Sequence, residues 1–360
     1  MSIKRVIISG GGTGGHIYPA ISIANAMKEI DPSLEFLFVG AEGKMEMEKV
    51  PKAGFKIIGL PIVGIQRTQV WKNILFPFKL AKSLFLSAKI LKDFKPDVAV
   101  GVGGYASGPL LLAARFLGIP YFIQEQNSFA GITNKALASK AEHIFVAYPG
   151  MERFFPAQKI TLSGNPVRKD LLESVGKREQ AAAHFHLDPA KKTLLIIGGS
   201  QGARTINQGI LAGLDRLGEA GVQVIWQTGI AFESTAKKAA EGISSAYVSA
   251  FIYEMDLAYA MADLVISRAG ASSVSEICLL GKASILVPLP SAAEDHQTEN
   301  AKSLVSQNAA ILVRDAEVKD QLISEALKAL KSDVSTLEKN SLRLAKPNAA
   351  HEIAQSILHA

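Results

Sequence analysis

The stretch that decides the fold reads Gly10-Gly11-Gly12-Thr13-Gly14-Gly15-His16. It follows a short apolar run at residues 6–8 and precedes a helical pattern, which we expect to begin near Tyr18-Pro19 and to end at Ile30. A strand, a glycine loop and a helix in this order bring backbone N–H groups close to a diphosphate or a sugar, because glycine permits tight turns and a helix N-terminus carries partial positive charge. The pattern predicts an α/β fold with a ligand at this loop, although a strand-to-helix turn without chemistry can have the same residues.

The composition of the 360-residue chain, 48% hydrophobic and 20% charged, is that of a globular protein of two domains. A single cysteine, Cys278, excludes an internal disulfide framework and fits a reducing compartment. Residues 1–8 lead straight into the first strand and no apolar run could span a bilayer, so we expect a cytoplasmic protein that can associate with a membrane. The net charge of +6 comes from residues 1–165 and favours phosphates, anionic lipids or nucleic acid as partners.

Near-continuous apolar runs recur in the first half of the chain, with helical patterns between several of them, at residues 36–39, 98–100, 121–123 and 144–146. This alternation predicts parallel strands joined by helices, in a sheet that is covered on both faces. Ligands of such sheets bind beyond the carboxyl ends of the strands.

The loops at those ends carry polar residues and further glycines. Residues 101–109 form a second glycine loop that contains Tyr105, and we expect Ser107 to cap a helix with Pro109 near its start. Glu125 and Asn127 follow the run at residues 121–123. They can bind sugar hydroxyls or form a simple turn, and the convergence of three loops at one sheet edge favours the binding site.

Residues 60–95 interleave aromatic side chains with basic ones, namely Trp71, Phe76, Phe78 and Phe85 with Arg67, Lys72, Lys79, Lys82, Lys89, Lys92 and Lys95. From Phe78 onward we predict a helix. Its apolar stripe consists of Leu80, Leu84, Ala88 and Leu91, and its opposite face of Lys82, Lys89 and Lys92 with Phe85 among them. Such a face suits a bilayer that contains anionic lipid, and the alternative is a solvated helix whose aromatics pack inward.

The second half of the chain starts as the first half does. After the turn at Asn165-Pro166, the apolar run at residues 194–197 leads into a glycine loop at residues 198–204. We therefore predict two doubly wound domains, residues 1–165 and 166–346, with a helical tail at residues 347–360 that packs back on the first domain.

Two further loops of the second half have binding potential. The strand-like run at residues 264–266 opens into small residues and then Glu276, which suits paired ribose hydroxyls or a helix dipole. A strand predicted at residues 286–290 leads to His296 and Gln297 at the same sheet edge. We expect no metal site, because His184 and His186 have no partners at metal-ligand spacing and are better explained as surface residues.

These motifs, in this order along essentially the whole chain, resemble those of the GT-B glycosyltransferases, and in particular family 28. The resemblance implies two Rossmann-like doubly wound α/β domains facing a cleft. It also implies an N-acetylglucosaminyltransferase of peptidoglycan synthesis, with UDP-N-acetylglucosamine (UDP-GlcNAc) as donor and undecaprenyl-linked lipid I as acceptor. Such an enzyme is peripheral at the cytoplasmic face of the membrane, meets an anionic membrane surface, binds no nucleic acid and requires no cofactor.

The resemblance also assigns residues by motif position. Arg168 and Ser200 would contact the diphosphate or uridine, and Ile252 would line the uracil pocket. Glu276 would bind the ribose hydroxyls and Gln297 those of the sugar. The residues facing the phosphates would be Ala271, Ser272, Ser273, Val274 and Ser275. The residues meeting the sugar or acceptor from the first domain would be Thr13, Gly14, Gly15, Tyr105 and Asn127.

The implied reaction is a single displacement with inversion. The C4 hydroxyl of the lipid-linked N-acetylmuramoyl group attacks the anomeric carbon of the donor, and UDP leaves. His16 is the candidate general base, because an unperturbed imidazole titrates near neutral pH, and Glu125 is the second choice. Helix N-termini and Arg168 would stabilise the leaving diphosphate without a metal.

Three rival readings remain open. Gly10, Gly12 and Gly15 also fit the loop of a nicotinamide-dependent oxidoreductase, with Glu42 near the acidic position after the second strand. Two features argue against an oxidoreductase: His16 directly follows the glycines, and the chain has a second domain with a glycine loop. The other two rivals are a UDP-GlcNAc epimerase and a non-enzymatic membrane adaptor that binds a nucleotide sugar.

Overall fold

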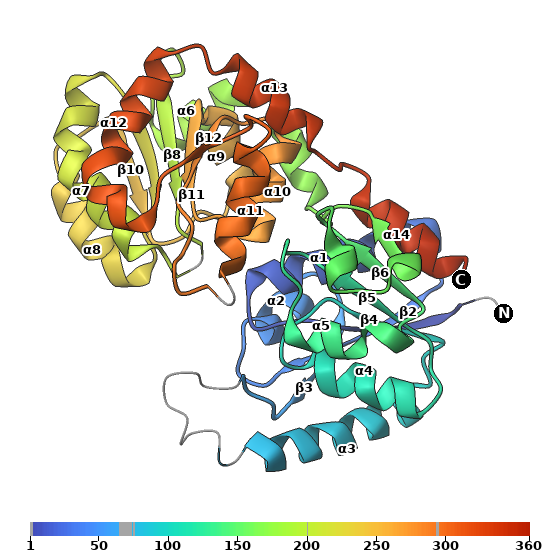
Figure 1. The fold of residues 1–360 in the computed structure, drawn as a ribbon. Helices are drawn as coiled ribbons and strands as arrows, with labels where there is room; N and C mark the ends of the chain where they lie inside the picture. Colours follow the sequence, from blue (N-terminus) through green and yellow to red (C-terminus); the bar gives the residue numbers. More distant parts are fainter. Residues whose placement is uncertain (1–2, 65–73, 75, 200, 293–294) are drawn as a thin grey trace. The chain divides into compact units, whose positions relative to one another are not determined.

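The computed structural model of the chain describes residues 3–64, 74, 76–199, 201–292 and 295–360 (Figure 1). The chain divides into two compact units. Unit 1 consists of Met1–Arg168 and Lys346–Ala360, and unit 2 consists of Lys169–Ala345. We describe each unit by itself.

Unit 1 is a parallel sheet of seven strands within the described residues. In sheet order the strands are β3 (Lys56–Leu60), β2 (Glu35–Ala41), β1 (Arg5–Ser9), β4 (Val98–Gly101), β5 (Tyr121–Glu125), β6 (His143–Val146) and β7 (Ile160–Leu162). Its helices are α1 (Gly14–Ile30), α2 (Glu46–Lys52), α3 (Phe76–Phe94), α4 (Ser107–Phe116), α5 (Ile132–Leu137) and α14 (Ala349–Leu358).

Helices cover both faces of this sheet, as the apolar strands predicted. In β1, Ile7 faces one core and Val6 and Ile8 face the other, and all three are fully buried. The first core lies under α3 and α4, and the second under α1 and α14. Each strand is apolar at nearly every position because neither of its faces meets water.

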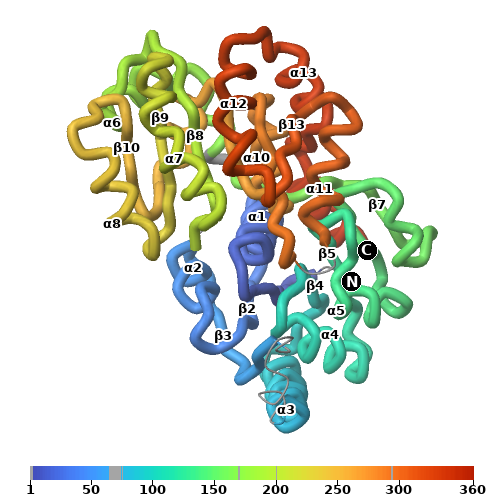
Figure 2. Tube along the Cα trace, turned by 60° about the vertical axis from the view of Figure 1, so that its left-hand side comes forward, coloured from blue at the N-terminus to red at the C-terminus, as the bar shows by residue number. Residues whose placement is uncertain are grey.

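Unit 2 repeats the arrangement with six parallel strands within the described residues. In sheet order they are β10 (Ala246–Ser249), β9 (Gln223–Gln227), β8 (Thr193–Ile197), β11 (Leu264–Ser267), β12 (Ser284–Leu286) and β13 (Ile311–Leu312). The helices are α6 (Arg178–Phe185), α7 (Arg204–Glu219), α8 (Ile230–Ala239), α9 (Met255–Met261), α10 (Ala271–Leu279), α11 (His296–Val305), α12 (Val318–Lys331) and α13 (Ser335–Arg343). Both views place α8 beside β10 and α7 (Figures 1 and 2). Both units thus have the doubly wound α/β fold that the sequence predicts.

Three local predictions were wrong. Helix α1 begins at Gly14 rather than near Tyr18, because the carbonyl of Thr13 accepts hydrogen bonds from the N–H groups of His16 and Ile17. Glycine is a poor helix former and proline favours a first helical turn, so the sequence pointed to a later start.

The other two errors concern a cap and a strand. Ser107 does not cap α4: it is the first helical residue, after Ala106, and its Oγ is buried without a described partner. The strand predicted at residues 286–290 is β12, which spans Ser284–Leu286 and so ends where the predicted strand begins. Pro288 and Pro290 cannot continue it, because they have no N–H to donate to a sheet.

Helix α3 has the outward face that the sequence predicts. Phe78 and Phe85 are 73% and 72% exposed, and the side chains of Lys82, Lys89 and Lys92 are exposed with them. The helix packs against α4 (Figure 2), and Ser83 and Ser87 on its opposite face are fully buried. The alternative in which these two aromatics pack inward is therefore wrong. Arg67, Trp71 and Lys72 lie outside the described residues.

Helix α14 belongs to unit 1 although it follows all of unit 2 in the chain. It packs against α1, and its buried residues complete the second core, namely Ala350, Ile353, Ala354 and Ile357. The tail predicted as a helix from Pro347 is this helix.

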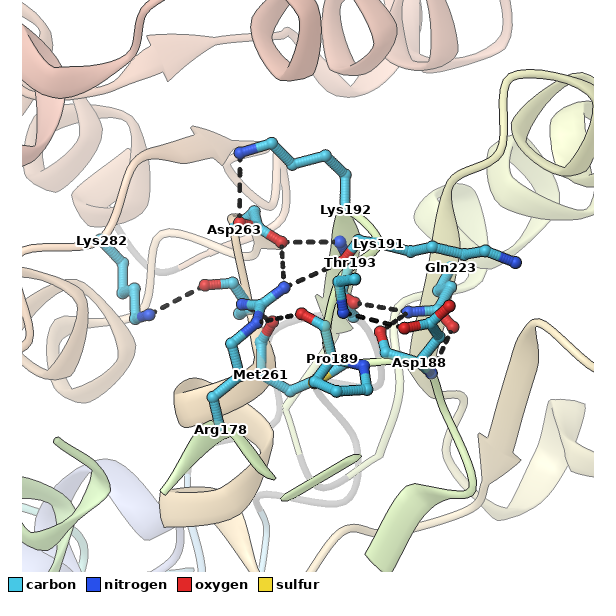
Figure 3. A network of polar contacts seen from close by, with 12 residues as sticks. Arg178, Asp188, Pro189, Lys191, Lys192, Thr193, Gln223, Met261, Asp263 and Lys282 are labelled. Carbon is cyan, nitrogen blue, oxygen red and sulfur yellow. Dashed lines mark hydrogen bonds and ion pairs between the residues drawn. The ribbon is translucent and has the colours of Figure 1, made fainter. Parts of the chain in front are cut away.

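Arg178 and Asp263 join α6 to the amino-terminal end of the unit 2 sheet (Figure 3). The carboxylate of Asp263, just before β11, accepts hydrogen bonds from Thr193 N at 2.8 Å and Arg178 Nη2 at 3.0 Å. Arg178 also donates to the carbonyls of Pro189, Met261 and Lys191. Burial of the ammonium group of nearby Lys282 lowers its pKa. This network lies at the end of the sheet opposite to the glycine loops.

We predict that Asp263→Ala destabilises unit 2 by about 1–3 kcal/mol, because it removes the acceptor of the Thr193 N–H and the charged partner of the Arg178 guanidinium. Thermal unfolding followed by circular dichroism measures the loss. Glu325→Ala is the control, since Glu325 contacts Lys328 at 3.8 Å on a helix surface and should contribute within about 0.5 kcal/mol. Equal melting temperatures for the two variants would contradict the stabilising role of the network.

Candidate functional site

The strand order of unit 1 reverses between β1 and β4, and the first two glycine loops follow these two strands. Ligands of open α/β sheets bind at such a reversal point, outside the carboxyl ends of the strands. The two predicted loops therefore lie side by side where a ligand is expected.

The loops touch backbone to backbone. Gly104 has a φ of +89°, and a methyl group on it would stand 2.3 Å from the carbonyl oxygen of Gly11. The ring of Tyr105 lies 3.5 Å from where a side chain on Gly12 would begin. No residue with a side chain fits at Gly104, so glycine is needed there for the contact itself.

His16 lies between the two loops, in the first turn of α1. Its Nδ1 is 3.2 Å from Thr13 Oγ1. A methyl group on Gly103 would stand 2.8 Å from its Cδ2 and 2.9 Å from its Nε2, so the imidazole lies against the second loop. The structure thus brings together Thr13, His16 and Tyr105, and it places Gly14 and Gly15 beside them in the same helical turn.

Glu125, at the end of β5, is 2% exposed and holds the next loop. Its Oε1 accepts hydrogen bonds from the backbone N and the Nδ2 of Asn127, at 3.1 and 3.4 Å. Its Oε2 accepts from Gly131 N at 3.0 Å and Asn134 Nδ2 at 2.8 Å. Burial raises the pKa of this carboxyl, and the four donors oppose that rise. Glu125 and Asn127 form one hydrogen-bonded group that shapes residues 126–131.

In unit 2 the loops that follow β8 and β9 make a similar close contact. A methyl group on Gly202 would stand 2.0 Å from the carbonyl oxygen of Thr228, and one on Gly229 would stand 2.3 Å from that of Gln201. Ser200, which the motif assigns to the diphosphate or uridine, lies outside the described residues.

Gln227, buried at the end of β9, joins two predicted donor-binding segments. Its Nε2 donates to the carbonyl of Gly199 at 3.1 Å, and its Oε1 accepts from Ile252 N at 3.0 Å. Ile252 itself is 2% exposed. The sequence reasoning missed this link, because nothing in a single strand shows which loops its last side chain will reach.

The amino terminus of α10 carries the residues assigned to the phosphates. Ala271, Ser272 and Ser273 are its first three residues, and N–H groups at these positions have no acceptor within a helix. The N–H of Val274 already donates to Gly270, and the hydroxyl of Ser275 donates to the carbonyl of Ala271. The first turn therefore offers an anion the N–H groups of its first three residues.

Glu276 and Gln297 are both fixed by neighbours. The Tyr259 hydroxyl, on a fully buried side chain, donates to Glu276 Oε2 at 3.0 Å. The backbone N of Leu289 donates to Gln297 Oε1 at 3.0 Å. Tyr259 is a second residue that sequence reasoning missed, and its spacing from Glu276 gives no signal that the two meet.

Arg168 is the last residue of the first segment of unit 1, and its guanidinium lies 5.2 Å from the centre of the Tyr18 ring. Among the residues that the structure describes, no group of three His, Cys, Asp or Glu side chains could hold a metal ion. Nor does any described helix have the length and apolar character needed to cross a bilayer.

The family model described as Glycosyltransferase family 28 N-terminal domain matches residues 6–146, and the one described as Glycosyltransferase family 28 C-terminal domain matches residues 193–357. A curated relative from Parabacteroides distasonis is 55% identical over 358 residues, which cover 98% of this chain and 97% of the relative. The chain belongs to glycosyltransferase family 28. Membership of family 28 excludes the oxidoreductase reading.

Relatives within family 28 cover the chain almost completely. Those from P. distasonis and Bacteroides fragilis are named UDP-N-acetylglucosamine--N-acetylmuramyl-(pentapeptide) pyrophosphoryl-undecaprenol N-acetylglucosamine transferase, and the second is 55% identical over 98% of this chain and 95% of its own. The crystal structure of Acinetobacter baumannii MurG matches with a TM-score of 0.77 and 30% identity, covering 99% of this chain and 100% of that one.

A UDP-N-acetylglucosamine 2-epimerase structure has a TM-score of 0.68 but only 15% identity, over 99% of this chain and 95% of that one, so it shares the fold alone. The predicted fold class, two Rossmann-like units of GT-B type, is confirmed.

We predict that Glu125→Gln destabilises unit 1 by about 1–3 kcal/mol, because an amide NH₂ would replace an oxygen that accepts two hydrogen bonds. Hydrogen–deuterium exchange of residues 126–131 should become faster. Glu142→Gln, the same change at an exposed position of unit 1, should leave this exchange as in the wild type. Unchanged exchange in the Glu125 variant would show that the carboxylate does not hold the loop.

Proposed function

We propose that this family 28 protein transfers N-acetylglucosamine from UDP-GlcNAc to the C4 hydroxyl of the N-acetylmuramoyl-pentapeptide of lipid I, with release of UDP. The observation that carries the proposal is 55% identity, over 98% of the chain, to curated enzymes named for this transfer. The product is lipid II, a precursor of peptidoglycan.

The proposed reaction is one displacement with inversion, and His16 is the proposed general base. A positioned base contributes roughly 10²–10⁴ in rate. The place of His16 supports this role, because its ring lies at the edge where two glycine loops meet and its Nδ1 is beside Thr13 Oγ1. Glu125 is the weaker candidate, since it is 2% exposed and its two oxygens accept four hydrogen bonds.

We propose that unit 2 binds the donor. The first three N–H groups of α10 suit the diphosphate, and the carboxylate of Glu276, held by Tyr259, suits the ribose hydroxyls. Gln297 would bind the sugar through Nε2, because its Oε1 is already bonded to Leu289 N. Ile252, Arg168 and Ser200 keep the roles that the motifs imply.

We also propose that no metal or other cofactor is required. Helix N-termini and the Arg168 guanidinium carry positive charge suited to the developing negative charge of the leaving diphosphate.

The proposed site of action is the cytoplasmic face of the membrane, where the protein is peripheral. The exposed Phe78 and Phe85 among the lysines of α3 support contact with an anionic bilayer. An acceptor anchored in the membrane also requires such contact. We propose no role for nucleic acid.

The transfer of labelled GlcNAc from UDP-GlcNAc to lipid I tests the function. We predict transfer by the wild type, unchanged in EDTA, and a loss of kcat of about 10²-fold or more in His16→Ala because the general base is gone. His184→Ala is the control, since His184 lies on α6 near Glu254 and should keep wild-type kcat.

Two results would overturn these proposals. Absence of transfer by the folded wild type would remove the function, and full turnover by His16→Ala would remove His16 as the base. Loss of activity in EDTA that added Mg²⁺ restores would contradict the metal-free reaction.

We predict that the triple variant Lys82→Ser, Phe85→Ser, Lys89→Ser binds anionic vesicles at least ten-fold more weakly, because each lysine near such a surface contributes about 1 kcal/mol. Co-sedimentation with phosphatidylglycerol vesicles measures binding, and the wild-type affinity should fall with added salt. Lys237→Ser with Lys238→Ser, on α8 of unit 2, is the control. Equal partitioning of the triple variant and the wild type would refute the membrane contact of α3.

A further inference from the structure

Glu46, the first residue of α2, is a completely buried carboxylate beneath the first glycine loop. Its Oε2 accepts a hydrogen bond from Gly12 N at 2.9 Å, and its Oε1 accepts one from Ala41 N at 2.9 Å. One side chain thus joins the loop that follows β1 to the end of β2, across 34 residues of sequence for the first bond.

Two glycines make the space that this carboxylate fills. A methyl group on Gly11 would stand 2.1 Å from Glu46 Oε1, and one on Gly40 would stand 2.5 Å from Glu46 Cγ. These separations are far shorter than any real carbon contact. The loop, the strand end and the side chain are therefore matched in shape, and a shift of Glu46 changes the path of the loop.

The Gly12 N–H that Glu46 binds points into the protein and not toward a ligand. The next residue, Thr13, is the N-cap of α1 and has its Oγ1 beside His16 Nδ1. Gly11 is the residue on which Gly104 of the second loop rests. Glu46 therefore contacts Gly11 and Gly12. This segment leads directly into Thr13 and His16, and it packs against the second glycine loop.

We infer that Glu46 is a positioning residue for the acceptor-side chemistry: its carboxylate fixes Gly11 and Gly12, and through Thr13 it sets the orientation of His16. The inference rests on the proposed function, in which His16 receives the proton of the acceptor hydroxyl.

The test compares Glu46→Gln and Glu46→Asp with the wild type in GlcNAc transfer to lipid I. The amide of glutamine has one acceptor where two donors converge, and aspartate is too short to reach both. We expect kcat to fall at least ten-fold in each, with the KM for UDP-GlcNAc within three-fold of the wild type because unit 2 is untouched. Hydrogen–deuterium exchange of residues 10–16 should become faster.

Asp97 offers a control at the opposite end of β1. This exposed carboxylate accepts hydrogen bonds from Lys4 N and Arg5 N, both at 2.8 Å, through one oxygen, Oδ2. Asp97→Asn should lower the melting temperature yet keep kcat within two-fold of the wild type. Glu48→Gln, on the surface of α2, should change neither.

A double-variant cycle separates positioning from general damage. Gly11→Ala alone should lower kcat, because its methyl group collides with Glu46 Oε1. In the background of Glu46→Ala the collision is gone, so Gly11→Ala should cost no further activity. Additive losses would show that the two residues act independently and would contradict the inference.

The inference fails if Glu46→Gln keeps wild-type kcat, or loses no more activity than Asp97→Asn at an equal loss of melting temperature. Glu46→Asp decides the question if Glu46→Gln does not fold. If the wild type transfers no GlcNAc, the proposed function fails, and exchange of residues 10–16 still reports whether Glu46 holds the loop.

Discussion

Direct contact between the backbones of two loops, at Gly11 and Gly104, is the constraint on which the rest of unit 1 depends. Gly104 rests on Gly11, and the imidazole of His16 rests on Gly103. Such contacts exist only where neighbouring parallel strands end at the same level and both loops lack a Cβ at the contact. The position of the imidazole is therefore a property of the sheet and not of one flexible loop.

The two units use different groups at their carboxyl edges. In unit 1 the buried carboxylates of Glu46 and Glu125 accept hydrogen bonds from backbone N–H groups of the loops and of a strand end. In unit 2 the first turn of α10 presents N–H groups at its end, and an amide, Gln227, joins the loops. The arrangement in unit 2 suits an anion, which agrees with the proposed binding of the donor diphosphate there.

The sequence predicts most of the fold because its signals are local. Each apolar run and each glycine loop can be recognised within a few residues, and together they predict both parallel sheets and the loops at their edges. The start of α1, the missing cap at Ser107 and the links of Glu46 and Tyr259 depend on which distant segments meet. In the sequence, Glu46 cannot be told from a glutamate on a helix surface. Its burial depends on the pairing of β1 with β2, which brings Gly12 to its carboxylate. The candidate base and the donor residues rest on motif order, which no single spacing would supply.

Because α14 belongs to unit 1 but follows unit 2 in the chain, it determines which unit can finish folding first during synthesis. A ribosome synthesises all of unit 2 before the residues of α14 that cover the apolar side of α1. Unit 1 therefore stays open on one side until the residues of α14 have emerged, whereas unit 2 is one continuous segment, Lys169–Ala345. The order of completion is thus the reverse of the order of synthesis, and the nascent protein carries an uncovered apolar surface that a chaperone can bind.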